Sequence, residues 1–474
     1  MYLMVEAGIR GGLSNITKRH AIAHQTEETV NKTHNIYLDA NNLYGWAMSQ
    51  AMPYGGFEKL TEPELQKLNV LSIPDDSPYG YILEVDLTYP KHLHDSHSDF
   101  PVAPVRRCVS FDELSPYSKS LYHKLGLKGQ PTKKLIADLH DKIHYIVHYR
   151  NLKLYLNLGL EVSKIHSALK FRQSFWLRDY ISLNTERRKQ AKNAFEKDFF
   201  KLMNNSIFGK TMENVRNRVD FELVHTEKRL KKLTARPRFH RIRHFNKDLV
   251  GVQCLRSVIK LNKPIYIGFC ILDISKTLMY DFHYNVIRKR YQNRAELCFT
   301  DTDSLLYHIQ TEDIFADMAE DIDKYDTSDF KKDHPLFSTK NKKVLGKMKD
   351  ELAGQSLDEF VGLRAKMYSI RCGEIESKTA KGVKRSVIRQ RLRHDMYVDC
   401  LYNERITKET MNVIRSFNHQ LFSLQCSKIA LSPFDDKRFV LPDKVNTRAH
   451  GHFRNSTEVV FDDLCRVSKT PDLS

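Results

Sequence analysis

Two carboxylates lie one residue apart in the stretch FTDTDSLLYHI, residues 299–309. Asp301 and Asp303 carry like charges between two apolar runs, and carboxylates held this close ionise together easily only where a cation lies between them. Mg²⁺ prefers hard oxygen ligands of this kind. Asp and Ser also stabilise turns between strands, so an ordinary hairpin connection is the alternative interpretation of these residues taken alone.

A third carboxylate, Asp39, lies in THNIYLDANNLYGWAMSQ, directly after a short apolar run at residues 36–38. This run predicts a strand, and a strand that ends in a carboxylate can place a ligand at a cleft. The alternative for Asp39 taken alone is the N-cap of a helix.

The segment 184–210 predicts one amphipathic helix, with Asn184 as N-cap and Gly209 as its end. One stripe is polar and holds Lys189, Asn193, Lys197, Lys201 and Asn205. The other stripe is apolar and holds Ala191, Phe195, Phe199, Met203 and Ile207. The stripes are about 200° apart around a helix, so we expect the apolar face to pack on the protein. The row of lysines then either meets a triphosphate or is a solvated surface.

The composition favours a polyanionic partner. The chain has 474 residues, of which 41% are hydrophobic, and 76 Lys and Arg against 58 Asp and Glu give a net charge of +18. Basic stretches at 227–243 and 377–394 predict contact with DNA, although both could be solvated faces. Residues 311–329 predict an amphipathic helix with an acidic outer face that points away from nucleic acid.

Cysteine spacing and hydropathy indicate an intracellular protein. The eight cysteines show no zinc-site spacing, and scattered thiols are typical of a reducing compartment. No apolar run reaches membrane-spanning length, and the start of the chain has no secretory signal pattern. We therefore expect no membrane partner and an intracellular location, with the nucleus favoured over an organelle.

Three of these segments resemble motifs A, B and C of family B DNA polymerases, in the same order: Asp39-x-x-x-Leu43-Tyr44, Lys201-x-x-x-Asn205-Ser206-x-Phe208-Gly209 and Asp301-Thr302-Asp303-Ser304. The resemblance is to the protein-primed branch found in viruses, linear plasmids and Polinton-type transposons. The stretch IRGG, with Gly11 and Gly12, resembles the YxGG element of that branch. Lys366-Met367-Tyr368 resembles its KxY element.

Four positions depart from the family pattern. Asn42 stands where Ser is frequent, and Gly45 replaces the Pro that usually follows Tyr in motif A. Phe208 replaces the Tyr of motif B, and Ile9 replaces the Tyr of YxGG. None of these departures removes a carboxylate.

The resemblance implies an α+β right-hand polymerase fold and a two-metal reaction. Asp39, Asp301 and Asp303 would be catalytic, with Asp39 and Asp303 as ligands of two Mg²⁺ ions and Asp301 in support. Such ions stabilise the charge on the entering and leaving oxygens of phosphoryl transfer.

The same resemblance assigns substrate contacts. The residues expected at the incoming nucleotide are Tyr44, Lys189, Lys197, Lys201 and Asn205, with Tyr44 excluding a 2′-hydroxyl. The residues expected at DNA are Gly11, Gly12, Ser206, Gly209, Lys366 and Tyr368, with Lys366 and Tyr368 at the primer terminus.

We expect the domains of a right hand with two inserts. They are a remnant of the exonuclease–polymerase junction at 1–29, the first part of the palm at 30–60, an insert resembling the terminal-protein region at 61–176, fingers at 177–212, a second and basic insert at 213–262, the second part of the palm at 263–375, and a thumb with the C-terminal segment at 376–474. A helix over 265–290 should pack on the motif C hairpin.

The family carries an amino-terminal exonuclease domain, whereas only 38 residues precede Asp39. We therefore expect this domain to be missing and proofreading to be absent. The run ILEVDL at 82–87 has its acids in the reverse order of a first exonuclease element.

The function expected from this resemblance is template-directed DNA synthesis in the replication of a virus-like or transposon-like element. The partners would be primer-template DNA, deoxynucleoside triphosphates and a terminal priming protein. The alternative is a catalytically silent transposon relic that only binds DNA. A reverse transcriptase would carry two adjacent Asp in place of Asp301-Thr302-Asp303, and a DxD glycosyltransferase would leave the lysine-rich segment unexplained.

Overall fold

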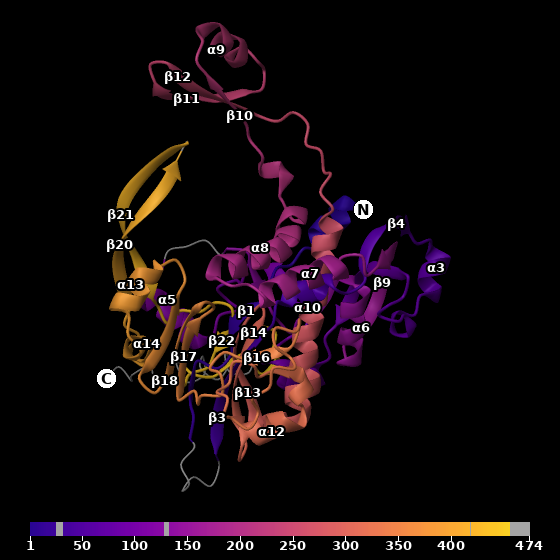
Figure 1. The fold of residues 1–474 in the computed structure, drawn as a ribbon, viewed down its shortest axis with the longest axis vertical. Helices are drawn as coiled ribbons and strands as arrows, with labels where there is room; N and C mark the ends of the chain where they lie inside the picture. Colours follow the sequence, from indigo (N-terminus) through magenta and orange to yellow (C-terminus); the bar gives the residue numbers. More distant parts are fainter. Residues whose placement is uncertain (25–31, 128–131, 418, 456–474) are drawn as a thin grey trace, which may run out of the picture.

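The computed structural model describes residues 1–24, 32–127, 132–417 and 419–455. Helices and strands are mixed along the chain, and the strands form several separate sheets (Figure 1). None of the helices in these ranges has the length and apolar character that crossing a membrane requires.

The central sheet has six strands in the order β1-β13-β14-β3-β16-β15. Its strands are β1 (Ser14–Ile16), β13 (Ala295–Asp301), β14 (Ser304–Gln310), β3 (Thr33–Ala40), β16 (Met348–Asp350) and β15 (Tyr325–Asp326). Neighbours are antiparallel, except that β15 and β16 are parallel. Both faces of β14 are buried, with Leu305 and Tyr307 in one core and Leu306 in another. A strand covered on both faces is continuously apolar, as SLLYHI is.

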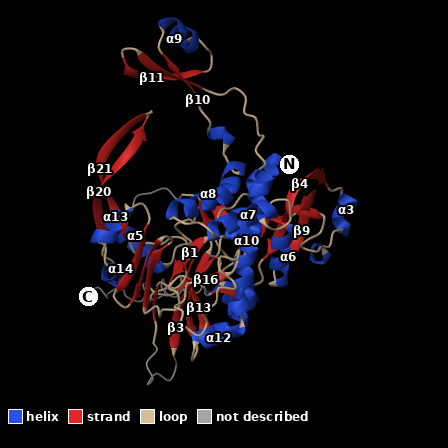
Figure 2. Ribbon diagram, in the orientation of Figure 1, coloured by secondary structure: helices blue, strands red, loops and turns tan. Residues whose placement is uncertain are grey.

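The helix expected over 265–290 is present as α10 (Ile265–Asp281), a π-helical segment η4 (Phe282–Arg288) and α11 (Lys289–Tyr291). Apolar residues surround most of α10, as is typical of a buried helix. Tyr280 packs in the core of the six-stranded sheet, whereas Phe269 packs in the core beneath the fingers. Figure 2 shows α10 running between the central sheet and the sheet of the first insert.

The acidic helix predicted over 311–329 is shorter than expected. α12 (Ile314–Glu320) buries Ile314 and Met318 as the periodicity indicated. The helix then gives way to η6 (Ile322–Lys324), because the next residues form β15 and join the central sheet.

The first insert is built on a four-stranded sheet in the order β4-β9-β5-β8. Its strands are β4 (Met52–Lys59), β9 (Glu161–Ser174), β5 (Tyr79–Thr88) and β8 (Lys142–His148), and a separate ribbon joins β6 (Val105–Arg107) to β7 (Lys134–Ile136). The helices of this part are α3 (Glu62–Lys67), η1 (Val70–Ser72), η2 (Lys91–Leu93), α4 (His94–His97), α5 (Pro116–Lys124) and α6 (Tyr149–Asn157). β4 pairs with β9, so the sheet of this insert begins ahead of residue 61.

A second sheet, in the order β19-β18-β17-β2, lies beside the central sheet. It contains β2 (His20–Ile22), β17 (Glu359–Arg364), β18 (Met367–Cys372) and β19 (Ile375–Ala380), and α13 (Arg385–Arg391) and α14 (His394–Tyr402) pack against it. The chain then forms the long hairpin of β20 (Thr407–Phe417) and β21 (Gln420–Leu431).

The second insert is a small unit with a core of its own. It consists of η3 (Val215–Asn217), β10 (Asp220–Val224), α9 (Glu227–Thr234), β11 (Phe239–Asn246) and β12 (Leu249–Cys254). Figure 1 shows this unit projecting from the body on the same side as the β20–β21 hairpin. The hairpin tip contacts it, because His419 stacks on Phe221 at 3.9 Å between ring centroids and Arg243 donates to the side-chain oxygen of Gln420.

The segment after β21 returns to the first insert. It contains the short strands β22 (Phe439–Val440) and β23 (Thr447–Arg448). The buried Arg438 donates to the Ser98 carbonyl at 2.8 Å, and the Leu139 N–H donates to the His450 carbonyl at 2.9 Å. Both ends of the hairpin are therefore rooted in the body of the molecule.

Candidate active site

Strand pairing brings the predicted carboxylates together. In the register of β3 and β14, Asp39 lies opposite Ser304, the residue after Asp303. The Ala40 N–H donates to the Asp303 carbonyl at 2.7 Å, which fixes the end of β3 to the hairpin turn. Residues 263 positions apart in the sequence thus meet because the two strands are neighbours in one sheet.

The hairpin turn that carries Asp301 and Asp303 is unusually tight. Thr302 has a positive φ of 68°, the Asp303 N–H donates to the Asp301 carbonyl at 2.8 Å, and the Thr302 N–H donates to the Leu13 carbonyl at 2.8 Å. Gly12 packs directly on this turn, since a Cβ at Gly12 would lie 2.3 Å from Thr302 Oγ1. Gly11 has open space at the same position, so only the second glycine of IRGG is required by packing.

The carboxylates interact electrostatically. Burial and the neighbouring charge of Asp303 raise the pKa of Asp39 to about 8. Burial also raises the pKa of Asp303, and the charge of Asp301 adds to this effect. The charge of Lys201 acts in the opposite direction on both groups. A cation between Asp39 and Asp303 would allow both to ionise at neutral pH.

The donor set fits Mg²⁺ held jointly with substrate. Within the described ranges, no group of three or more His, Cys, Asp or Glu side chains is placed to hold a metal ion. Mg²⁺ usually takes one or two carboxylates together with waters and substrate phosphates. Asp39 and Asp303 supply that number of carboxylates.

Asp301 is engaged differently from the other two carboxylates. Lys366 Nζ lies 3.1 Å from Asp301 Oδ1, and Lys366 occupies the turn between β17 and β18 with a positive φ of 61°. Tyr368 is only 9% exposed and stacks on Phe299 at 4.5 Å between centroids. The structure therefore ties the KMY element to the motif C hairpin through one ion pair and one ring contact.

The fingers differ from the single helix predicted over 184–210. They are two helices, α7 (Arg178–Lys189) and α8 (Ala194–Thr211). Asn193 has an extended backbone and accepts a hydrogen bond from the Glu196 N–H at 2.9 Å, so it is the N-cap of α8 and interrupts the predicted helix. Gly209 does not end α8, and Asn184 lies inside α7 and is buried.

This break separates the predicted lysine stripe. Lys189 lies at the end of α7 and its Nζ is 2.8 Å from Glu186 Oε1. Lys197, Lys201 and Asn205 remain on α8. The predicted apolar stripe is also only partly right, because Phe195 is 78% exposed whereas Ile207 packs on the core beneath the fingers.

Tyr44 and Phe208 meet between α2 (Leu43–Met48) and α8. Their ring centroids are 4.7 Å apart. Burial and the charge of Asp303 raise the pKa of Tyr44 to about 12. Tyr44, Phe208, Lys201 and the carboxylate pair therefore share one site.

The departure at the motif A turn has a local explanation. Asn42 has a positive φ of 43°, and its side chain accepts from the Gly45 N–H at 3.3 Å. A Cβ at Gly45 would lie 2.2 Å from Asn42 Nδ2. Proline at this position would have no N–H to donate, so Asn42 and Gly45 form one alternative turn.

Ser206 and Gly209 are the two further residues of α8 that were predicted to contact DNA. Ser206 Oγ donates to the Met203 carbonyl at 2.9 Å within α8. Gly209 is exposed, and a Cβ there would meet no atom within 4 Å. Their contact with DNA stays a prediction.

Two charged residues near the site were missed. Lys349 lies opposite Asp39 in the register of β16 and β3. The charge of Lys349 lowers the pKa of Asp39, whereas that of Glu351 raises it. β16 has only three residues, so no periodicity in the sequence could have revealed this placement.

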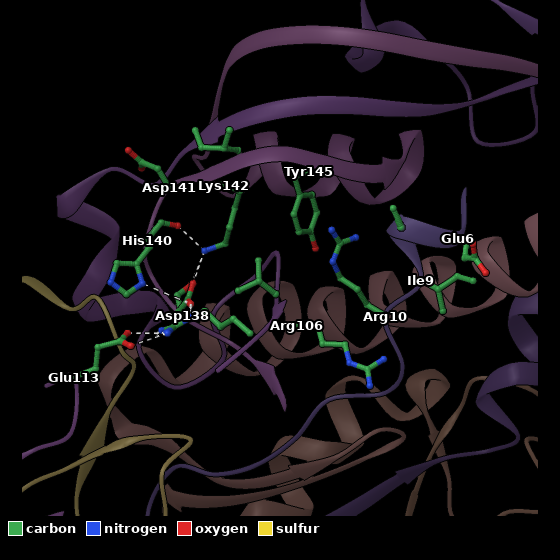
Figure 3. A pocket seen from close by; sticks show the side chains of 14 residues that line it. Glu6, Ile9, Arg10, Arg106, Glu113, Asp138, His140, Asp141, Lys142 and Tyr145 are labelled. Atoms are coloured by element: carbon green, nitrogen blue, oxygen red, sulfur yellow. Dashed lines mark hydrogen bonds and ion pairs between the residues drawn. The ribbon is translucent and has the colours of Figure 1, made fainter. Parts of the chain in front are cut away.

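A cavity lies away from these carboxylates (Figure 3). It has a volume of about 670 Å³ and lies between residues 6–10 and the β6–β7 ribbon. Asp138 lies 2.7 Å from Arg107 Nε and also pairs with the buried Lys142. The Arg10 guanidinium lies 3.8 Å above the Tyr145 ring. Most charges that line this cavity neutralise one another. These contacts therefore connect the first insert to the start of the chain.

Comparison with known proteins identifies the family of this chain. The family model described as DNA polymerase type B, organellar and viral, matches residues 1–237. This chain belongs to that family. No curated protein matches the chain.

Solved structures show the same fold. Phi29 DNA polymerase in an orthorhombic crystal form is 15% identical, with a TM-score of 0.51. Its ternary complex with primer-template DNA and incoming nucleotide substrates gives the same identity and TM-score. Each match covers 90% of this chain and 62% of the Phi29 chain. The α+β right-hand polymerase fold is thereby confirmed, and the chain spans less than two thirds of the Phi29 polymerase length.

Proposed function

We propose that this chain is a DNA-directed DNA polymerase that adds deoxynucleotides to a primer 3′-hydroxyl. The observation that carries the proposal is the placement of Asp39 and Asp303 at the ends of adjacent strands, within the influence of Lys201. Membership of the type B family supports it.

In the proposed reaction, the primer 3′-hydroxyl loses its proton to solvent and its oxygen forms a bond to the α-phosphorus. The bond to the bridging oxygen breaks, and pyrophosphate leaves. Two Mg²⁺ ions held by Asp39, Asp303 and the triphosphate would stabilise the charge on the entering and leaving oxygens. Lys201 would offset the negative charge of the triphosphate.

Tyr44 and Phe208 would form the floor under the sugar of the nucleotide. Lys366 would contact the primer terminus, and the ion pair with Asp301 would hold its position. In this proposal Asp301 is a positioning residue, which agrees with the supporting role expected from the sequence.

DNA would pass between the palm on one side and the β20–β21 hairpin and second insert on the other. The contacts of His419 with Phe221 and of Gln420 with Arg243 join the hairpin to the second insert, and such a closed arch would retain DNA during synthesis. We also propose that the chain acts in the replication of a virus-like or transposon-like element, with a terminal priming protein as partner and an intracellular location.

A primer-extension assay tests this function. The purified chain is incubated with a primer-template, deoxynucleotides and Mg²⁺, and elongation should require the template and stop in EDTA. Asp112→Asn, an exposed carboxylate outside the site, serves as the matched control for later variants. Absence of elongation by the intact chain under all metal conditions would refute the proposal.

A further inference from the structure

A cluster of aromatic rings joins the central sheet to the neighbouring sheet of β17 and β18. Its members are Tyr37, Phe299, Phe360 and Tyr368. The ring centroids of Tyr37 and Phe299 are 5.2 Å apart, and those of Phe299 and Tyr368 are 4.5 Å apart. Gly362 leaves room for this packing, since a Cβ there would lie 2.7 Å from Phe360 Cζ. The rings therefore connect strand β3, the motif C hairpin and the KMY element in one packed group.

Neighbouring strands fix the position of Tyr37 on both sides. Tyr37 lies two residues before Asp39, so both side chains project from the same face of β3. On one side, Tyr37 pairs with Leu306 of β14. On the other side, the N–H of Glu351, just after β16, donates to the Tyr37 carbonyl at 2.9 Å. The backbone of Tyr37 is thus held within the sheet that carries the carboxylates.

The Tyr37 hydroxyl extends this connection to polar groups. Burial raises the pKa of Tyr37, so its hydroxyl stays protonated at neutral pH. Hydrogen bonds with Tyr368 and Ser304 also act on this hydroxyl, and the one with Ser304 lowers the pKa of Tyr37. A hydrogen bond lowers the pKa of a phenol when it is donated to the phenol oxygen. Ser304, the residue after Asp303, therefore donates to Tyr37.

Tyr368 receives hydrogen bonds from two neighbours. Burial raises the pKa of Tyr368, whereas hydrogen bonds with Tyr37 and Thr379 lower it. Thr379 lies opposite Tyr368 in the register of β18 and β19. Both neighbours thus donate to the Tyr368 oxygen, which has two lone pairs. The proton of the Tyr368 hydroxyl is then left for an acceptor outside the protein, such as an oxygen of the primer.

We propose that Tyr37 is a positioning residue that orients the Tyr368 hydroxyl toward the primer terminus. This inference rests on the proposed polymerase function and extends it to a residue outside motifs A, B and C. Tyr37 acts through Tyr368, and the chain of hydroxyls from Ser304 keeps Tyr368 at a fixed place relative to the turn that carries Asp303. The primer 3′-hydroxyl would thereby be aligned with the α-phosphorus, and alignment of this kind contributes to the rate of the chemical step.

The test compares Tyr37→Phe, which removes the hydroxyl and keeps the ring, with Tyr307→Phe. Tyr307 is the matched control, because it is a buried tyrosine of the same sheet whose hydroxyl lies 3.1 Å from His283 Nδ1 in the core on the other face of β14. Tyr37→Phe should lower the single-turnover rate at saturating deoxynucleotide about tenfold, the effect of one lost hydrogen bond. The KM for the nucleotide and the Kd for primer-template should not change. Tyr307→Phe should match the parent in all three.

Two further measurements distinguish positioning through Tyr368 from a structural role. In Tyr368→Phe the hydroxyl that Tyr37 orients is already gone, so the addition of Tyr37→Phe should cause little further loss of rate. The second measurement involves no chemistry and uses 2-aminopurine at the primer 3′ end, in the complex without nucleotide. Its fluorescence should differ between Tyr37→Phe and the parent and should be the same for Tyr307→Phe and the parent.

The outcomes separate the two proposals. If the intact chain does not extend a primer, the polymerase function fails and this inference fails with it. If the chain extends primers but Tyr37→Phe matches Tyr307→Phe in rate and in fluorescence, the function stands and the inference is wrong. A loss of rate that persists in full in the Tyr368→Phe background would also overturn the inference, because Tyr37 would then act through another group.

Discussion

At the scale of single residues, the electrostatics of the site depend on charged groups that lie far apart in the sequence. Asp39, Asp301 and Asp303 stand out by type and spacing, and pairing of β3 with β14 brings Asp39 next to the motif C turn. Lys349 carries no such pattern, because its placement depends on a three-residue strand. Tertiary contact alone reveals it.

The raised pKa of Asp39 predicts a dependence of stability on pH. Its folded-state pKa, about 8, lies above the unfolded value of about 3.9. Ionisation in the folded protein is therefore unfavourable, and stability should fall as the pH rises from about 4 through about 8. Asp39→Asn should remove this loss and, in EDTA at pH 8, be more stable than the parent by up to about 5 kcal/mol.

Urea denaturation of both proteins at pH 5 and pH 8 measures this difference. Mg²⁺ should reduce it at pH 8, because the ion favours the ionised carboxylates. Equal changes in the free energy of unfolding for the two proteins between these pH values would contradict the raised pKa.

Tyr44 is the residue that we expect to discriminate between deoxyribonucleotides and ribonucleotides. Its ring packs on Phe208 at 4.7 Å between centroids, and we expect it to fill the space that a 2′-hydroxyl would need. Tyr44→Ala should lower the ratio of kcat/KM for a deoxynucleotide to that for the matching ribonucleotide. An unchanged ratio would remove Tyr44 from the sugar pocket.

At the scale of secondary-structure elements, the sequence predicted which segments are helical better than where they end. The helix around α10 matches its predicted range closely, because its apolar character is continuous. The fingers were predicted as one helix, yet Asn193 caps a new one, since an Asn side chain competes for backbone N–H groups. The exposed Phe195 shows that an apolar stripe alone does not identify the packed face.

Because IRGG packs on the motif C hairpin, one added methyl group at Gly12 should strongly lower kcat. A second substitution should restore part of it. Gly12→Ala would place Cβ 2.3 Å from Thr302 Oγ1, so the turn that carries Asp303 must move. We expect a large loss of kcat with little change in nucleotide KM. Gly11→Ala, which has open space, is the control and should remain active.

A second substitution distinguishes this mechanism from general damage. In Gly12→Ala/Thr302→Gly the clashing side chain is gone, and glycine suits the positive φ at position 302. Steady-state primer extension should show partial recovery of kcat. A double variant no more active than Gly12→Ala would argue against a steric link between the two elements.

At the scale of the whole molecule, the sequence predicts an order of palm, fingers and inserts, but no pattern in it indicates the long-range contacts. Arg438 is buried against Ser98, 340 residues away, and the hairpin tip touches the second insert. Neither contact has a local signal, since it depends on the folding of separate parts.

The arch formed by the hairpin and the second insert predicts an effect on processivity. Phe221→Ala removes the ring that stacks on His419, so each binding event should yield shorter products, while single-nucleotide incorporation stays unchanged. Phe417→Ala is the control, because this ring is 65% exposed on the same hairpin. Product lengths measured with a heparin trap that match those of the parent would rule out a role for this contact.

The central claim is that Asp39 and Asp303 support phosphoryl transfer at one site. The most direct measurement is the single-turnover rate of deoxynucleotide incorporation by Asp39→Asn and Asp303→Asn, with Asp112→Asn as control and primer-template Kd measured in parallel. Each site variant should lose more than nine tenths of the rate while the Kd stays within a few-fold, because phosphate contacts elsewhere supply the affinity. A site variant that keeps more than a tenth of the parent rate would contradict it.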